Sequence, residues 1–105
     1  MDDKIVIDFS VAGNGSLNES FLRMFGASVQ AILKAMFGGS SIPMSIRGSP
    51  QQVEQFAQTL SHEKRYWDAY QKFGLDSPMT YKSKFRLNSA IRDFERVTGL
   101  VWPLH

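Results

Sequence analysis

Apolar and polar residues alternate over the first structured segment that we predict in the chain. A period of two residues is typical of a strand with one apolar face. We predict this strand over residues 5–11, and its apolar face consists of Ile5, Ile7, Phe9 and Val11. Gly13-Asn14-Gly15 follows, and two glycines so close together end a strand.

The next segment has the spacing of a helix, which we predict from about Leu17 to Phe37. Ser16 and Glu19 fit a capping box, in which the serine caps the helix and the glutamate bonds back to the cap. Apolar residues surround most of this helix, and its polar residues form one narrow stripe of Arg23, Gln30 and Lys34. A surface helix usually has a wider polar face, so either the other helices or a second chain must cover this one.

A second strand and a second helix follow. Ile42, Met44 and Ile46 alternate with polar residues, which predicts a strand over residues 42–47. Ser49-Pro50-Gln51-Gln52 predicts a helix start, because serine caps, proline suits the first turn and glutamine completes the box. This helix extends to Gly74, and it either continues through residues 61–63 or breaks there.

Residues 79–87 fit two different structures. Their apolar positions alternate, which predicts a third strand, whereas Ser77-Pro78 is a suitable start for a helix that reaches Val97. From Asn88 onward the spacing is helical in both interpretations, and Thr98-Gly99 ends the helix. We expect the apolar tail over residues 100–104 to pack back onto the core.

This order of elements predicts an α/β or α+β fold for a single domain over residues 1–105. A strand–helix–strand unit forms a small parallel sheet, and two or three helices follow it. In one of the two interpretations a third strand at 79–87 joins them. Two strands are not stable alone, so helices must cover a face of the sheet or a partner chain must extend it.

Composition narrows the functional classes. The absence of cysteine excludes disulfides, thiolate zinc sites and cysteine nucleophiles, and a net charge of +2 identifies no partner. The acidic start Asp2-Asp3 is unlike a secretory signal, and charged residues interrupt the most apolar stretch, Phe21 to Phe37. We therefore expect a cytoplasmic protein with no membrane span.

The second half of the chain carries a series of short motifs. They are Ile46-Arg47-Gly48-Ser49, Tyr70-Gln71-Lys72-Phe73-Gly74-Leu75-Asp76-Ser77-Pro78 and Phe94-Glu95-Arg96-Val97-Thr98-Gly99-Leu100-Val101-Trp102-Pro103. Over residues 46–103 the chain resembles small uncharacterised proteins that tailed phages of the marine myovirus type encode. The resemblance implies a viral protein in the cytoplasm of a host cell, and it implies no activity and no site residues.

Two strand-to-helix turns form one candidate site. If the strands are parallel, both turns lie at the same edge of the sheet, and both helices direct free N–H groups at one place. Such an edge favours anions, and the predicted anion-binding residues are Ser16, Arg47, Gly48 and Ser49. The alternative is that these residues only turn and cap the chain, since neither the complete dinucleotide motif nor a phosphate-binding loop is present.

A basic segment forms the other candidate site. Five cations lie between residues 82 and 96, and only Asp93 and Glu95 offset them. Cations neutralise phosphates and aromatic rings stack on unpaired bases, so the candidate nucleic-acid-binding residues are Tyr81, Lys82, Lys84, Arg86, Arg92 and Arg96. On a strand Lys82, Lys84 and Arg86 would form one row, whereas on a helix they would spread and give a weaker site. The alternative is a solvated face over a packed core, with the rings of Tyr81 and Phe85 turned inward.

The sequence predicts no catalytic residues, no metal site and no cofactor. His62 and Glu63 are neighbours, but on a helix they point about 100° apart and do not form an acid–base pair. We therefore expect a non-enzymatic interaction domain, a homo-oligomer that associates through the helix at 17–37 and an open strand edge. Nucleic-acid binding is the alternative function, and an anion-binding domain or an enzyme is the third.

Overall fold

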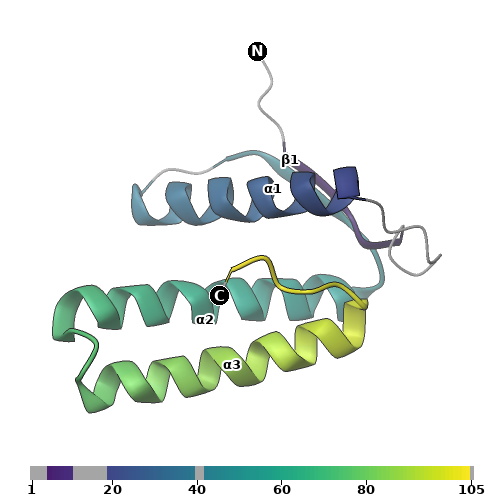
Figure 1. The fold of residues 1–105 in the computed structure, drawn as a ribbon. Helices are drawn as coiled ribbons and strands as arrows, with labels where there is room; N and C mark the ends of the chain where they lie inside the picture. Colours follow the sequence, from purple (N-terminus) through teal and green to yellow (C-terminus); the bar gives the residue numbers. More distant parts are fainter. Residues whose placement is uncertain (1–4, 11–18, 40–41, 105) are drawn as a thin grey trace.

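Three helices and a two-stranded parallel sheet make up the described residues, 5–10, 19–39 and 42–104, of this computed structural model (Figure 1). The elements follow the order β1 (Ile5–Asp8), α1 (Glu19–Phe37), β2 (Met44–Arg47), α2 (Pro50–Phe73) and α3 (Pro78–Thr98). This architecture is a small α+β fold, as the order of patterns along the sequence predicts. No helix of the described residues is long and apolar enough to cross a membrane.

The two strands pair in parallel, so the predicted strand–helix–strand unit is confirmed. Ile7 lies opposite Ile46, and Asp8 lies opposite Arg47. Ile7 and Phe9 are buried while Val6 is exposed, which is the predicted alternation. β1 ends at Asp8, earlier than predicted, because the chain turns at Phe9 and Ser10; Val11, the last residue of the predicted strand, lies outside the described residues.

Local sequence determines the start of α2. The side chain of Ser49 accepts a hydrogen bond from the Gln52 backbone N–H (3.1 Å), and the Gln52 side chain accepts one from the Ser49 N–H (2.9 Å). The predicted capping box is therefore present. From this cap α2 runs without a break to Phe73, so the interpretation that breaks the helix at 61–63 is wrong.

Residues 79–87 belong to α3, and the interpretation that makes them a third strand is wrong. Ser77 caps this helix through its side chain, which accepts the Met79 N–H at 3.2 Å. The residues that α3 buries follow a helical period: Thr80, Leu87, Ala90, Phe94 and Thr98. The strand interpretation assumed that the alternating apolar residues are buried on one face. Several of them face solvent instead: Met79, Tyr81 and Phe85.

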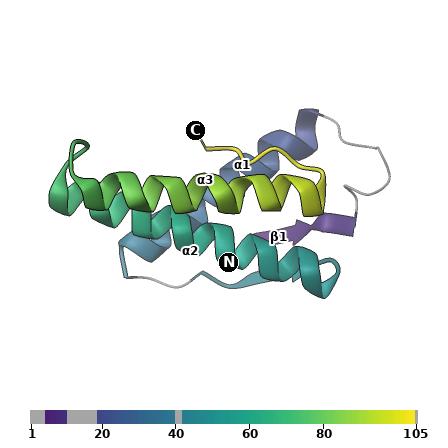
Figure 2. The same ribbon diagram turned by 90° about the horizontal axis from the view of Figure 1, so that it is seen from below.

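The two long helices form an antiparallel hairpin (Figure 2). Two buried threonines contact backbone carbonyls of the hairpin. The Thr80 hydroxyl donates to the carbonyl of Gly74 (2.6 Å) and lies 3.2 Å from that of Ala69, and the Thr59 hydroxyl donates to the carbonyl of Gln55 (2.8 Å) and lies 3.3 Å from that of Ala90 across the hairpin. In both ribbon views the turn of this hairpin projects past the end of α1, whereas the other end lies against the sheet. The end of the hairpin near the sheet therefore contributes to the core, whereas the end with the turn extends beyond α1.

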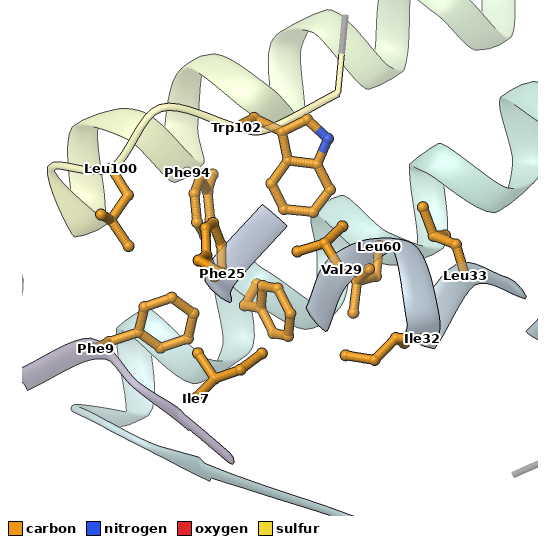
Figure 3. Close-up of a cluster of buried hydrophobic side chains, with 11 residues drawn as sticks. Ile7, Phe9, Phe25, Val29, Ile32, Leu33, Leu60, Phe94, Leu100 and Trp102 are labelled. Carbon is orange, nitrogen blue, oxygen red and sulfur yellow. The ribbon is translucent and has the colours of Figure 1, made fainter. Parts of the chain in front are cut away.

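The core lies where β1, α1, the hairpin and the C-terminal tail meet (Figure 3). Trp102 of the tail is 2% exposed and reaches into this cluster, where its ring lies 5.1 Å from that of Phe94. Its indole Nε1–H donates a hydrogen bond of 2.9 Å to the buried Glu63 of α2. The expectation that the tail packs on the core is confirmed.

Candidate nucleic-acid interface

Basic and aromatic residues lie together along the exposed side of α3. Tyr81, Phe85, Arg92 and Arg96 share one face of the helix, because their spacings are close to whole numbers of turns. Tyr81 is 65% exposed and Phe85 is 70% exposed. The structure therefore excludes the interpretation in which these two rings turn inward.

Two more cations border this row. Lys82 and Arg86 are also exposed, and each lies about 100° around α3 from the ring that precedes it, so both flank the row on one side. We call the six residues the basic face: Tyr81, Lys82, Phe85, Arg86, Arg92 and Arg96. Lys84 is not part of it, since its ammonium group lies over the ring of Tyr66 in α2, 4.8 Å from the ring centre. Tyr81, Arg92 and Arg96 of the six predicted residues thus share the row with Phe85, and Lys82 and Arg86 flank it. Because residues 79–87 are helical, Lys82, Lys84 and Arg86 do not form the single row that a strand would have given.

Most of the positive charge on the basic face is not neutralised within the described part of the molecule. Arg96 forms an ion pair with Asp93 at 3.0 Å, and both side chains are largely exposed. Among the described residues, Lys82, Arg86 and Arg92 have no carboxylate within 4.0 Å. These three cations are available to an external anion.

Exposed apolar side chains gather in the same part of the hairpin. Twelve large apolar residues of the described chain are exposed, and six of these lie between residues 70 and 85: Tyr70, Phe73, Leu75, Met79, Tyr81 and Phe85. A concentration of exposed apolar and aromatic side chains is typical of an interaction site. Exposed ring surface is therefore concentrated near the turn of the hairpin, where Lys82 and Arg86 add positive charge. Arg92 and Arg96 lie on the part of α3 that also carries the core residue Phe94.

A groove beside the basic face joins α3 to α2. It has a volume of about 240 Å³, and its lining includes Gln58 and His62 of α2 together with Phe85, Arg86, Ser89 and Asp93 of α3. The α2 residues of this groove are not among the residues that the sequence predicts for a site. The four-residue spacing of Gln58 and His62 places them on one helix face, but the register between the helices is not visible in the sequence.

His62 reports the electrostatic field in this groove. Partial burial lowers its pKa, and the positive charges of Arg65 and Arg86 lower it further. The two arginines come from different helices, so positive charge acts on His62 from both α2 and α3. His62 does not pair with Glu63, whose buried side chain instead binds Trp102.

The other predicted site lies where β2 leads into α2. The parallel sheet does bring the ends of both strands to one edge, but Ser16 lies outside the described residues. The Ser49 N–H and side chain are already bonded in the capping box, and the carboxylate of Asp8 lies near Arg47. Two hydrogen bonds from Ser10 hold the pKa of Asp8 below its usual value, so this carboxylate stays negative beside the site. Anion binding by Ser16, Arg47, Gly48 and Ser49 remains a prediction that this geometry does not strengthen.

An apolar hollow lies between β1 and α1. Its volume is about 180 Å³, and its lining includes Val6, Phe21, Met24 and Phe25. Val6 is 57% exposed and Met24 is 69% exposed. Within the described part of the chain, each strand of the sheet pairs on one side only.

Neither a protein-family model, nor a curated protein, nor a solved structure matches this chain. Among the residues that the structure describes, no group of three or more His, Asp or Glu side chains is placed to hold a metal ion. The geometry of the hairpin is therefore the basis on which a function is assigned.

Proposed function

We propose that the protein binds single-stranded nucleic acid through the basic face of α3, without catalysing a reaction. The observation that supports this proposal best is the outward position of Tyr81 and Phe85 on the helix face that also carries Arg92 and Arg96. Cations attract the phosphates, and the aromatic rings provide surfaces on which unpaired bases stack.

A single strand fits this surface better than a duplex does. In a duplex the faces of the bases are stacked on one another, so exposed rings gain nothing from them. Without base contacts, Tyr81 and Phe85 would remain exposed apolar surface in the complex. We therefore expect little preference for base sequence, because every base offers a face for stacking.

The contribution of charge is tested by replacing Arg92 with glutamine. The full chain is titrated into a fluorescent oligothymidylate of about 20 nucleotides at several salt concentrations, and anisotropy is measured. We expect log K to fall with log salt, and Arg92→Gln to make the slope shallower by about 0.7, the loss of one phosphate contact. Lys34→Gln, an exposed cation on α1, is the matched control and leaves affinity and slope unchanged.

The contribution of stacking is tested separately at Phe85. Phe85→Leu removes the ring, and we expect it to weaken binding by about 1–3 kcal/mol with no change in the salt slope. Phe85→Tyr keeps a ring and retains the affinity. Polyglutamate has charges but no bases; if it competes as well as oligothymidylate, or if nothing binds at low salt, the proposal is wrong.

Self-association is a second candidate function, supported by the hollow between β1 and α1. The outer edge of β1 offers its backbone groups, and antiparallel pairing with β1 of a second copy would give a symmetric four-stranded sheet. The exposed Val6 and Met24 lie beside that edge and would be covered. Light scattering behind a sizing column tests this: Met24→Lys converts a dimer to a monomer, and a wild-type monomer at high concentration contradicts the idea.

We also propose that the protein is cytoplasmic and that a phage encodes it. A cytoplasmic position follows from the sequence pattern, and a phage origin follows from the resemblance over residues 46–103. Both stay predictions. A protein with this function would act as an accessory to nucleic-acid processes in the host cell.

A further inference from the structure

We infer that the groove between α2 and α3 holds a phosphate group of the bound strand, with Arg65 and Arg86 as its cationic ligands and Phe85 beneath the adjoining base. This inference rests on the proposed function and locates the strand on the hairpin. It extends the binding surface from α3 onto α2, where nothing in the sequence marks a nucleic-acid-binding residue.

The two arginines are suited to this role by their position and by the absence of a nearby carboxylate. Arg65 lies one helical turn after His62 on α2, and Arg86 lines the opposite wall on α3. Both guanidinium charges lower the pKa of His62. Arg86 lines the groove, whereas Arg65 lies outside its lining on α2, one turn beyond His62. Neither has a carboxylate within 4.0 Å among the described residues. A guanidinium binds phosphate oxygens through paired hydrogen bonds.

The remaining lining favours a phosphate over a cation. Asp93 is the acidic residue of the lining, and its carboxylate is bonded to Arg96 at 3.0 Å. Gln58 and Ser89 add polar side chains that can donate hydrogen bonds to oxygen. Phe85 forms part of the rim and is 70% exposed, so a base attached to the phosphate can reach its ring.

The size of the groove favours part of a polymer over a free small molecule. Its volume of about 240 Å³ is below the usual range of about 300–1,000 Å³ for small-molecule pockets. A phosphate and its sugar fit such a space while the rest of the strand continues along the basic face. The groove and the basic face share Phe85 and Arg86, so one strand can occupy both.

His62 offers a direct reporter of this contact. NMR of the full chain follows the ring signals of His62 against pH with and without saturating oligothymidylate. A phosphate between Arg65 and Arg86 cancels their repulsion of a protonated ring, so the pKa of His62 rises. The charged groups that face His62 are Arg65 on its own helix and Arg86 and Asp93 on α3.

Variants separate the groove from the rest of the surface. We expect Arg65→Gln and Arg86→Gln each to weaken oligothymidylate binding about tenfold, the loss of one charge-assisted contact. In Arg86→Gln the pKa of His62 is already raised in the free protein, and the strand raises it less. The matched control Arg92→Gln, at saturation, retains the full shift of His62.

The outcomes distinguish this inference from the proposed function. If oligothymidylate binds and Arg92→Gln weakens it, but His62 keeps its pKa, the strand avoids the groove and only this inference fails. If no oligonucleotide binds at low salt, both fail. If inorganic phosphate alone shifts His62 as much as the strand does, the groove is a site for free anions, and its assignment to the strand is overturned.

Discussion

Glu63 and Trp102 form a contact between two side chains that the core excludes from water. Glu63 is fully buried, and it accepts a hydrogen bond of 2.9 Å from the indole Nε1–H. A buried polar group without a partner costs free energy, so this bond both satisfies the carboxyl oxygen and ties the tail to α2. No buried side-chain nitrogen or oxygen of the described residues lacks a hydrogen-bond partner.

The contribution of this bond is measured with Trp102→Phe, which keeps an aromatic ring and removes the N–H donor. We expect the free energy of unfolding to fall by about 1–3 kcal/mol, because the buried oxygen loses its indole partner. Urea denaturation followed by circular dichroism gives the value. Val101→Ala, at a 72% exposed position of the same tail, is the control and changes stability by less than about 0.5 kcal/mol. Equal losses in both variants would contradict the role of the bond.

At the scale of an element, the start of α2 depends on the residue before its cap. Gly48 has a φ of +154°, and a Cβ atom there would lie 2.7 Å from the side-chain oxygen of Gln52 and 3.0 Å from the Cβ of Phe9. That oxygen accepts the Ser49 N–H in the capping box, and Phe9 belongs to the core. A side chain at Gly48 would therefore disturb the cap and the core together.

We expect Gly48→Ala to lower the free energy of unfolding by about 1–3 kcal/mol, through backbone strain and the displaced cap. Ser49→Ala, which removes only the capping hydroxyl, should cost about 1 kcal/mol. Thermal unfolding followed by circular dichroism compares the two. Gly39→Ala is a useful control, because Gly39 also has a positive φ but a Cβ atom there would meet no described atom within 4 Å. If Gly48→Ala costs no more than Gly39→Ala, the close contacts do not matter.

Most elements are predictable from the sequence, because their caps are local signals. Ser49 identifies the start of α2, and the alternation around Ile7 identifies β1 and its buried face. The sequence does not show whether residues 79–87 form a helix or a strand. An exposed helix face normally carries polar residues, but here it carries Tyr81 and Phe85. The ambiguity thus arises at residues that the proposed function uses.

The candidate site is predictable only in part. The cations of α3 lie close together in the sequence, so the excess of basic over acidic residues between 82 and 96 identifies them. His62 lines the groove from α2, some twenty residues earlier in the chain, and Arg65 follows it by one helical turn. Only the register of the hairpin, which contacts such as Thr59 to Ala90 determine, brings the two sets together.

At the scale of the molecule, four phenylalanine rings join the separate parts of the chain. Phe9 follows β1, and Phe25, Phe56 and Phe94 come from the three helices. The ring centres of Phe9 and Phe56 lie 5.3 Å apart, and those of Phe56 and Phe94 lie 6.2 Å apart. Aromatic rings at such distances and tilts attract one another, so this cluster connects the sheet to the hairpin.

Phe56→Ala tests this connection. Phe56 is fully buried, and we expect its truncation to lower the free energy of unfolding by about 3–5 kcal/mol through lost burial and the remaining cavity. Phe73→Ala, on the same helix but 45% exposed, is the matched control with a much smaller effect. Calorimetry supplies both melting temperatures, and an unchanged value for Phe56→Ala would contradict the central position of this ring.

The short connection between α2 and α3, residues 74–77, favours early pairing of these two helices during folding. Little loop entropy is lost when two helices close over so few residues, whereas pairing Ile5 with Met44 closes a much longer loop. We therefore expect the hairpin to form early in folding and the sheet, α1 and the tail to dock on it afterwards. On this expectation, the surface proposed to bind nucleic acid would be formed by the hairpin before the rest of the core has closed.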